Sequence, residues 1–556
     1  MNVNDKYEKI FIRRGYIKYI LPAVLSMIFG QLSPLVDAIC VSSKLGDAAL
    51  SAFSTVSPVY YFFNIIGVLG GMGGGIGIAK ASGSGSDKRA GRLFTLAIIL
   101  TTAITVLFSI LFLFFVDPLL KALCATTENF GYAKEYLIIL LIGMVFYVLD
   151  FAVQYILTDD NNPNLAMACG IVTGVVNMII DYAGIYLFNQ GIWVTAFGTV
   201  FGAFCGLLVS LLHFRKPDRL CHFVLEGITL DRGSVSELVK PGSPEALQYA
   251  LIVFQLLIGN FVLSGNMGTS GLGNAAVIEN LELIATIVIA GVSESVMPLA
   301  ASYFGERNTH GLNLVKKYAF VIGILTLLPL VLSLLIYPQW LLAFFFIDDP
   351  VMKATLPASI RIMAITQMVV LINTIFVCYL SSTEEEHKAN ISYVIMSIVQ
   401  IILTYALSSV SPENAPWYAS LTGGLTALVY FIFGCGLLTP KPFEATEGSL
   451  YVSGGCTSEE TVRTCIEGAG KYLTGDEYAA VREKIADPLM HLADAGKKRL
   501  FSFWVISRSR SDKSVILRYA SKEDMIDEHF DECIYSEFNF TRRIMLNFGS
   551  NEEGEE

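Results

Sequence analysis

Two acidic side chains lie inside apolar stretches, where they are the residues of this chain best suited to bind an ion. Asp181 lies in the apolar stretch 165–187, and Asn177 precedes it by one helical turn, so the two share a helix face. Asp37 lies near the end of the stretch 17–40. The stretch around Asp181 contains no basic residue. Because a carboxylate inside a membrane helix costs a few kcal/mol or more, such a residue indicates a functional site if the chain crosses a membrane.

The composition indicates a membrane protein. The chain has 556 residues, a mean hydropathy of +0.58 and 16% charged residues, against about 25% in soluble proteins. A formal net charge of −11 argues against nucleic acid as a partner. The 10 cysteines show no CxxC and no metal-ligand spacing, and the 6 histidines form no ligand cluster or catalytic dyad. We therefore expect no metal centre, no cofactor and no enzymatic activity.

Apolar stretches of about 20 residues are long enough to cross a bilayer. About twelve are present, at 17–40, 53–79, 93–116, 136–157, 165–187, 191–213, 244–265, 275–301, 317–337, 358–380, 389–411 and 416–437. Lysine and arginine gather in alternate loops, before the first stretch and after the second, sixth and eighth. By the positive-inside rule, both termini are cytoplasmic. We expect a multi-pass protein of the cell membrane, plasma or inner.

An internal repeat divides these stretches into two halves. The segment 45–50, LGDAAL, recurs at 272–277 as LGNAAV, and 176–183 recurs at 399–406. The predicted fold class is therefore an all-α polytopic membrane protein with two six-helix lobes. The lobes cover 1–220 and 244–440, with a cytoplasmic linker at 221–243. Since both halves begin on the same side, they are parallel repeats, an arrangement found in transporters.

The repeat also reveals an asymmetry between the lobes. Asp181 corresponds to Thr404, and Asn177 corresponds to Gln400. Asp37 lies nine residues before the first copy's glycine, Gly46, whereas Ser264 lies nine before the second copy's Gly273. An acid needed only for folding would be expected in both halves. The difference favours a functional site confined to the N-terminal lobe.

These residues form an ordered set that resembles the multidrug and toxic compound extrusion (MATE) family over roughly 15–440. The matching pieces are Pro22, Leu35-Val36-Asp37, Leu45-Gly46 with Ala48-Ala49, Asn162-Pro163 with Ala166-Met167, Asn177 with Ile180-Asp181-Tyr182, and Gly191-Ile192 with Thr199. Two departures stand out. Thr158 and Asn161 replace the family's usual Arg and Gly, and Ile252 and Val253 stand where one branch carries a glutamate.

The resemblance implies export of small organic, often cationic or amphipathic molecules, driven by inward H⁺ or Na⁺. It also implies an ion-coupling cluster of Asp37, Asn177, Asp181 and Thr199, to which Asp150 is a possible addition. Two carboxyl groups that face one cavity repel each other when both are charged, so such a pair can hold and release a proton. With Asn177 and a threonine hydroxyl, the same oxygens can instead hold Na⁺. Both ions remain open, and no substrate-binding residue is assigned.

Two further features of the sequence bear on function. Glu294, in the eighth stretch, is a candidate for lining a cavity of the second lobe. The glycine run 70–77 superficially resembles a phosphate-binding loop, but it lies in an apolar stretch and lacks Gly-Lys-Ser/Thr. Close helix packing is the better interpretation of that run.

The segment 441–556 has a soluble composition and predicts a small cytoplasmic α+β domain. Thr457-Ser458-Glu459-Glu460 is typical of a helix start, and a second helix is expected over about 476–495. The stretches 501–506 and 514–519 predict paired strands. This order weakly resembles a histidine-kinase/anti-sigma-factor ATPase-like domain.

The nucleotide motifs of that domain are degenerate here. Its Glu-x3-Asn motif has its nearest match in Glu483-x3-Asp487, followed by His491, and 519–523 contains no glycine where a Gly-rich nucleotide box belongs. We therefore expect no nucleotide binding and a regulatory or scaffolding role.

Two alternatives remain open at this stage. A flippase for lipid-linked precursors would favour several basic residues in the cavity, and few are evident. A membrane sensor acting through 441–556 would favour intact nucleotide motifs, which are absent.

Overall fold

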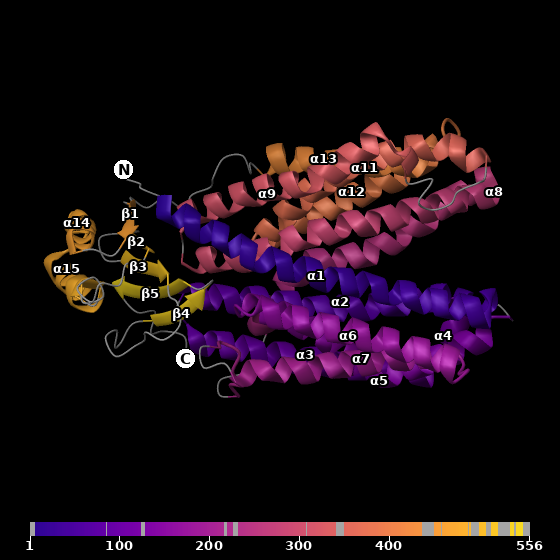
Figure 1. Ribbon diagram of the computed structural model, residues 1–556, viewed down its shortest axis with the longest axis horizontal. Coiled ribbons are helices and arrows are strands. Elements are labelled where there is room, and N and C mark those ends of the chain that lie inside the picture. The colour runs from indigo at the N-terminus through magenta and orange to yellow at the C-terminus, as the bar shows by residue number, and fades with distance from the viewer. Residues whose placement is uncertain are drawn as a thin grey trace.

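The computed structural model describes most of the chain. The described residues are 6–84, 86–123, 128–215, 219–225, 232–306, 308–340, 350–435, 450–456, 459–487, 489–490, 500–507, 513–520, 534–538 and 541–548. Two bundles of helices lie side by side, and a small β-containing domain lies at the end of the bundles where α1 begins (Figure 1).

The N-terminal lobe consists of long helices that match the first six predicted stretches. They are α1 (Lys6–Leu45), α2 (Asp47–Ser84), α3 (Asp87–Phe114), the short α4 (Val116–Ala122), α5 (Phe130–Asp159), α6 (Pro163–Tyr182) with the π-helical turn η1 (Ala183–Leu187), and α7 (Trp193–Ser210) with the 3₁₀ turn η2 (Leu211–Arg215). The chain reverses between α1 and α2 at Gly46, whose φ of +81° favours glycine. Asn161 has a φ of 60° just before Pro163 opens α6, so asparagine supplies the left-handed residue of that turn.

The C-terminal lobe repeats the pattern. It contains α8 (Arg232–Gly305), α9 (Thr309–Ile336), α11 (Pro350–Ser382), α12 (Glu386–Leu407), and α13 (Ala415–Val429) with η3 (Tyr430–Gly434). In the described part of the chain, 11 helices are long and apolar enough to cross a membrane. The predicted stretch 244–265 lies within α8. The expectation of an all-α polytopic membrane protein with about twelve spanning helices is confirmed.

The 74-residue element α8 reverses direction within its length. Leu238 lies against Gly73 of α2, and Gly305 lies against Gly83 of the same helix. A straight helix would separate Leu238 from Gly305 by about 100 Å, whereas Gly73 and Gly83 are only about 15 Å apart along α2. Therefore α8 folds back on itself and supplies both the seventh and the eighth predicted spans.

The packing of helix pairs confirms the internal repeat. A Cβ on Gly202 of α7 would meet Thr173 O of α6 at 2.5 Å and Asn177 Cβ at 3.4 Å. A Cβ on Gly423 of α13 would meet Met396 O of α12 at 2.7 Å and Gln400 Cβ at 3.5 Å. The α6–α7 and α12–α13 pairs thus approach through a glycine at the same place, and Asn177 matches Gln400 as the sequence predicts.

The C-terminal domain is built on an antiparallel sheet in the order β1-β2-β3-β5-β4. Its strands are β1 (Leu450–Cys456), β2 (Leu500–Ser507), β3 (Lys513–Ala520), β4 (Ile534–Phe538) and β5 (Thr541–Phe548). The predicted pairing of 501–506 with 514–519 is confirmed by the antiparallel β2–β3 register, in which Trp504 faces Ile516. The strands β1, β4 and β5 are not among the predicted elements.

One face of this sheet packs on helices α14 (Glu459–Ala469), α15 (Gly475–Val481) and the π-helical turn η4 (Arg482–Ala486). The second helix therefore begins where expected, while 491–499, its predicted end, lies outside the described residues. The start of the first helix, Thr457-Ser458, also lies outside them. On the other face of the sheet, the Trp504 ring lies 5.7 Å from the His310 ring at the start of α9. The domain thus contacts the membrane-spanning part.

Candidate ion-binding site

The carboxyl groups of Asp37 and Asp181 meet between α1 and α6. They lie close enough to share a hydrogen bond when one of them carries a proton. Asp37 is 8% exposed and Asp181 is 0% exposed. Oδ1 of Asp37 and both oxygens of Asp181 are buried without another hydrogen-bond partner among the described residues. Because two adjacent buried carboxylates repel each other, this pair needs a proton or a cation.

Asn177 joins the pair to a third helix. Its Oδ1 accepts a short hydrogen bond from Ser33 Oγ of α1, and its Nδ2 donates to Thr199 Oγ1 of α7 at 3.1 Å. Thr199 in turn donates to Thr195 O at 3.0 Å. The amide is therefore fixed from both sides, and α1, α6 and α7 each contribute an oxygen beside the carboxyl pair.

Two tyrosines complete the surroundings. The Tyr60 hydroxyl of α2 lies near Thr199, and Tyr136 of α5 lies near both Asp37 and Asp181. The sequence analysis missed Ser33 and Tyr136. Ser33 lies one turn before Asp37, so helical spacing alone could have found it, whereas nothing in the sequence pairs Tyr136 with either acid.

The tight approach of α7 to α6 leaves room for Asp181 only because residue 198 is glycine. A Cβ on Gly198 would lie 2.6 Å from Asp181 Oδ1 and 3.3 Å from Asn177 Nδ2. Such a separation is well below van der Waals contact. The missing side chain at 198 is therefore part of what positions the carboxyl group.

Asp150 lies in a different network from the carboxyl pair. Its Oδ2 accepts hydrogen bonds from Thr173 Oγ1 and Gln154 Nε2, both at 2.9 Å. Gln154 Oε1 accepts a third bond from Ser26 Oγ of α1 at 3.4 Å. Thr173 precedes Asn177 by one turn on α6. Asp150 is thus a neighbour of the Asp37–Asp181 cluster along α6, and its role as an ion ligand stays a prediction.

A second buried polar group lies at the end of α5 and is not among the predicted site residues. Asp160, His213 and Cys221 bring one ligand atom each within 4.8 Å of one another. Asp160 Oδ2 and His213 Nε2 lie 2.6 Å apart, closer than the roughly 3.3 Å expected between two ligands of one tetrahedral ion. Asp160 also accepts from the Leu220 and Cys221 amides at 3.0 Å each. This geometry is that of a hydrogen-bonded cluster, which fastens 219–221 to the end of α5.

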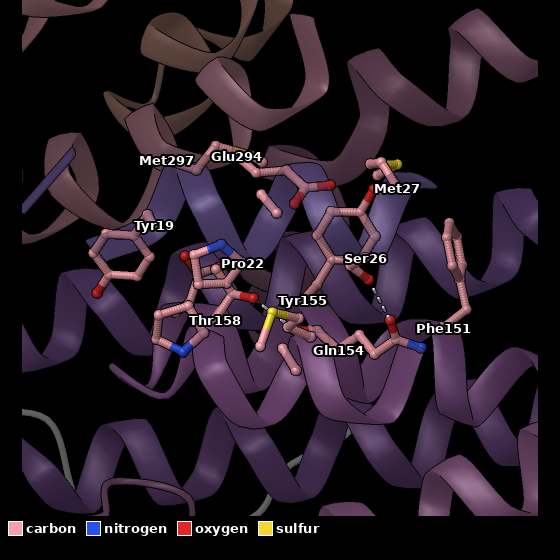
Figure 2. Close-up of a pocket in the computed structure, with 15 residues that line it drawn as sticks. Tyr19, Pro22, Ser26, Met27, Phe151, Gln154, Tyr155, Thr158, Glu294 and Met297 are labelled. Carbon is pink, nitrogen blue, oxygen red and sulfur yellow. Dashed lines mark hydrogen bonds between the residues drawn. The ribbon is translucent and has the colours of Figure 1, made fainter. Parts of the chain in front are cut away.

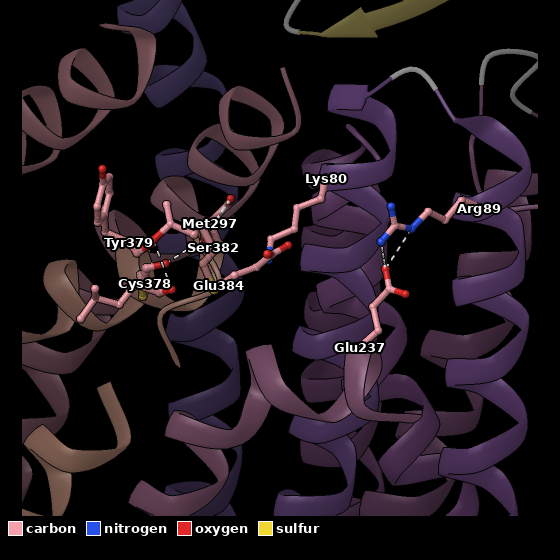
Figure 3. A network of polar contacts seen from close by, with 10 residues as sticks. Lys80, Arg89, Glu237, Met297, Cys378, Tyr379, Ser382 and Glu384 are labelled. Carbon is pink, nitrogen blue, oxygen red and sulfur yellow. Dashed lines mark hydrogen bonds and ion pairs between the residues drawn. The ribbon is translucent and has the colours of Figure 1, made fainter. Parts of the chain in front are cut away.

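The lobes are in contact at the end where the C-terminal domain lies. Lys80 Nζ of α2 is 3.7 Å from Glu384 Oε1, and Arg89 of α3 forms an ion pair with Glu237 of α8 at 2.5 Å (Figure 3). A Cβ on Gly83 would lie only 2.2 Å from Ser302 O, so α2 touches the second half of α8 there. The two lobes therefore touch at this end.

Two lobes of membrane-spanning helices, one of which holds a buried carboxyl pair, are typical of a membrane transport protein. The family model MatE matches 22–183 and 244–406, one segment in each lobe and together more than half of the chain. The chain belongs to the MatE family.

The relatives and solved structures agree with this assignment. The chain is 22% identical over 409 residues to the multidrug export protein MepA of Staphylococcus haemolyticus (strain JCSC1435), covering 72% of this chain and 88% of MepA. The MepA of Staphylococcus aureus (strain MRSA252) is 20% identical, over 72% of this chain and 89% of the relative. A structure described as an outward-facing multidrug resistance MATE transporter aligns with a TM-score of 0.71 at 20% identity, covering 79% and 99% of the two chains.

Proposed function

We propose that this protein is a secondary antiporter that exports small organic molecules, often cationic or amphipathic, in exchange for H⁺ or Na⁺. The buried Asp37–Asp181 pair carries this proposal, because it holds more negative charge than its neighbours neutralise. Asn177 and Thr199 supply neutral oxygens beside it. The names of the relatives, multidrug export proteins, support the class of substrate.

The coupling step follows from the charge of this pair. A proton shared by the carboxyl groups, or a Na⁺ ion held by them and Asn177, removes their repulsion and lets α1 and α6 approach. When the ion leaves, the carboxylate of Asp181 again repels that of Asp37 on α1. An ion gradient then biases the position of α1 relative to α6.

Helix α1 can pass this change from one lobe to the other. Its first part packs on the C-terminal lobe, where Tyr16 Oη donates to Val315 O of α9 at 2.7 Å. Its last part, with Cys40 and Val41, packs in the N-terminal lobe. Pro22 and Pro34 lie inside the helix and each removes a backbone hydrogen bond. Bending at these prolines would alternate the access of a central path between the two sides of the membrane.

The proposal includes the orientation of the protein in the membrane. Both termini face the cytoplasm of a cell that carries this protein in its plasma or inner membrane, because alternate loops at that end carry the basic residues. The contact of Lys80 with Glu384 then lies on the cytoplasmic side. The domain at 441–556 acts as a scaffold or regulator without nucleotide chemistry, since 519–523 lacks glycine.

The test is efflux of a fluorescent organic cation from membrane vesicles under separate H⁺ and Na⁺ gradients. Wild type is expected to export with one of the two gradients, which names the ion, and Asp181→Asn is expected to lose this export. Asp117→Asn is the matched control, because Asp117 forms a surface ion pair with Lys134 at 2.7 Å. Equal gradient-driven export by wild type and Asp181→Asn would refute the role of the carboxyl pair.

A further inference from the structure

The C-terminal domain meets the membrane-spanning part through the face of its sheet that its own helices leave uncovered. Along β2, the side chains of Phe501, Phe503 and Val505 pack on α14, α15 and η4. Trp504 points to the opposite face, because side chains alternate along a strand, and its Nε1 donates to Ser502 Oγ at 2.8 Å. The sheet lies between its helices and the two bundles (Figure 1). The face that carries Trp504 is therefore turned toward the bundles.

This second face of the sheet is buried. Trp504 and the residue opposite it on β3, Ile516, are both fully buried, although neither belongs to the apolar core between the sheet and its helices. The Trp504 ring lies 5.7 Å from the His310 ring at the start of α9, and β1 and β2 contact α1. A buried aromatic side chain is the kind of residue that contributes most to the stability of an interface. The domain is therefore docked on α1 and α9, and not merely joined to the lobes by the chain.

The start of α1 is held by both lobes at once. Tyr16 Oη donates to Val315 O of α9, in the C-terminal lobe, at 2.7 Å. Two residues further along, Lys18 Nζ donates to Asn161 Oδ1 at 2.6 Å and to Asn161 O at 3.3 Å, in the α5–α6 turn of the N-terminal lobe. Tyr16 and Lys18 are only about 3 Å apart along the axis of one helix. Separation of the lobes at this end must therefore break one of the two contacts.

Helix α1 has room to move just beyond these contacts. Tyr19, Pro22 and Ser26 of α1 line a pocket of about 60 Å³, whose other sides include Thr158 of α5 and Met297 of α8 (Figure 2). The helix is thus less tightly packed on this side, in a space large enough for water. Pro22 also removes a backbone hydrogen bond of the helix at this place. A bend at Pro22 therefore lets the start of α1 follow one lobe while its remainder follows the other.

We propose that the docked C-terminal domain is a clamp that keeps the start of α1 on the C-terminal lobe and thereby slows the separation of the lobes. The domain contacts both α1 and α9, so it adds to the hold that Val315 has on Tyr16. This inference rests on the proposed function, in which the lobes move apart at this end during the export cycle. It gives the segment 441–556 control over the rate of export.

The direction of the effect follows from the two contacts of α1. With the domain docked, separation of the lobes must break the contact of Lys18 with Asn161, in which the donor is charged. A charged donor makes the stronger kind of hydrogen bond. Release of the domain opens a second route, in which α1 leaves α9 and only the neutral bond of Tyr16 to Val315 is lost together with the nearby apolar packing. An additional route raises the rate of separation, so the docked domain acts as a brake.

The first experiment measures hydrogen exchange by mass spectrometry in the purified full-length protein, in peptides from the start of α1 (6–19). Trp504→Ala is expected to raise the exchange rate of these amides about tenfold or more, and His310→Ala about threefold, because each removes one side of the docking contact. The double variant should exchange about as fast as Trp504→Ala, since both substitutions remove the same contact. Arg463→Ala, which removes an exposed side chain of α14, is the matched control and should exchange as wild type does.

The second experiment measures efflux of a fluorescent organic cation from membrane vesicles under the ion gradient that drives wild type. His310→Ala and Trp504→Ala are expected to export about twofold faster or more, because conformational steps limit the rate of many cycles of this kind. Trp504→Phe keeps an aromatic ring at the contact and should lie between wild type and Trp504→Ala in both experiments. Thermal unfolding of each variant identifies misfolded protein. His310 lies outside the C-terminal domain, so His310→Ala tests the clamp without altering that domain.

The two readouts separate this inference from the proposed function. Unchanged exchange of the α1 amides in His310→Ala overturns the clamp, even if Trp504→Ala, which can unfold the domain, changes that exchange. Faster exchange with unchanged or slower export overturns the control of export by the domain. Faster exchange in both variants, with no gradient-driven export by wild type, supports the clamp on α1 and refutes the antiporter.

Discussion

The two lobes pack alike but differ in chemistry. In both, a glycine brings a helix against the carbonyl of its neighbour, Gly202 on Thr173 O and Gly423 on Met396 O. At the next equivalent position the N-terminal lobe has Asp181, which is fully buried, and the C-terminal lobe has Thr404, which is 3% exposed. The shared packing therefore does not require a carboxylate. Both lobes therefore share the helix packing of the repeat, whereas only the N-terminal lobe has the buried acid at this position.

The residue that faces Asp181 also differs between the two lobes. Gly198 leaves space for the carboxylate. The equivalent of Gly198, counted from Gly202 and Gly423, is Ala419, which is fully buried. The Ala419 methyl group can be accommodated there because the hydroxyl oxygen of threonine lies one bond closer to the backbone than the carboxylate oxygens of aspartate. The change from threonine to aspartate is thus matched by a change from alanine to glycine on the facing helix.

The largest effect is expected from making the N-terminal lobe resemble the C-terminal one. Asp181→Thr should abolish ion-driven export, because the remaining Asp37 carboxyl group loses its partner in holding the ion. The measurement is gradient-driven efflux in vesicles, with protein amount in the membrane as control. Export at the wild-type level would show that the difference between the lobes is not functional.

The reverse exchange tests the cost of the charge. Thr404→Asp should destabilise the protein by about 2–3 kcal/mol, the order of cost for an acid placed in a membrane helix, because Ala419 fills the space that Gly198 leaves open. Thermal unfolding checks it, with Thr404→Asn as the uncharged control. The ion dependence of export should not change. A more stable Thr404→Asp protein would contradict this account.

Filling the space at residue 198 should act on both packing and coupling. Gly198→Ala places a methyl group 2.6 Å from Asp181 Oδ1, and such overpacking typically costs about 1–3 kcal/mol. We expect lower stability and a weaker apparent affinity for the coupling ion. Gly423→Ala in the other lobe should lower stability alone. An equal change in ion affinity for both variants would remove the distinction between the lobes.

The smallest effect is expected at the hydroxyl that fixes Asn177. Thr199→Val removes the acceptor of the 3.1 Å bond from Asn177 Nδ2. A neutral hydrogen bond contributes about 0.5–1.5 kcal/mol, so the apparent ion affinity should fall about two- to tenfold. Thr199→Ser keeps the hydroxyl and should behave as wild type. Titration of export rate against ion concentration measures both variants.

The sequence by itself determined the frame of this protein. Apolar length predicted the spanning helices, including both halves of α8, because the bilayer sets the length of a helix that crosses it. The recurrence of 45–50 and 176–183 predicted the repeat, and helical period placed Asn177 and Asp181 on one face. These properties are local: each depends on residues that are near one another in the chain.

Only the tertiary structure decided which side chains meet across the chain. The contacts of Ser33 with Asn177 and of His213 with Asp160 join residues more than fifty positions apart. No spacing rule predicts such pairs, because they depend on how the helices turn and cross. The strand β1, with the paired glycines Gly454 and Gly455, forms only because it adds to β2, since glycine weakens an isolated strand.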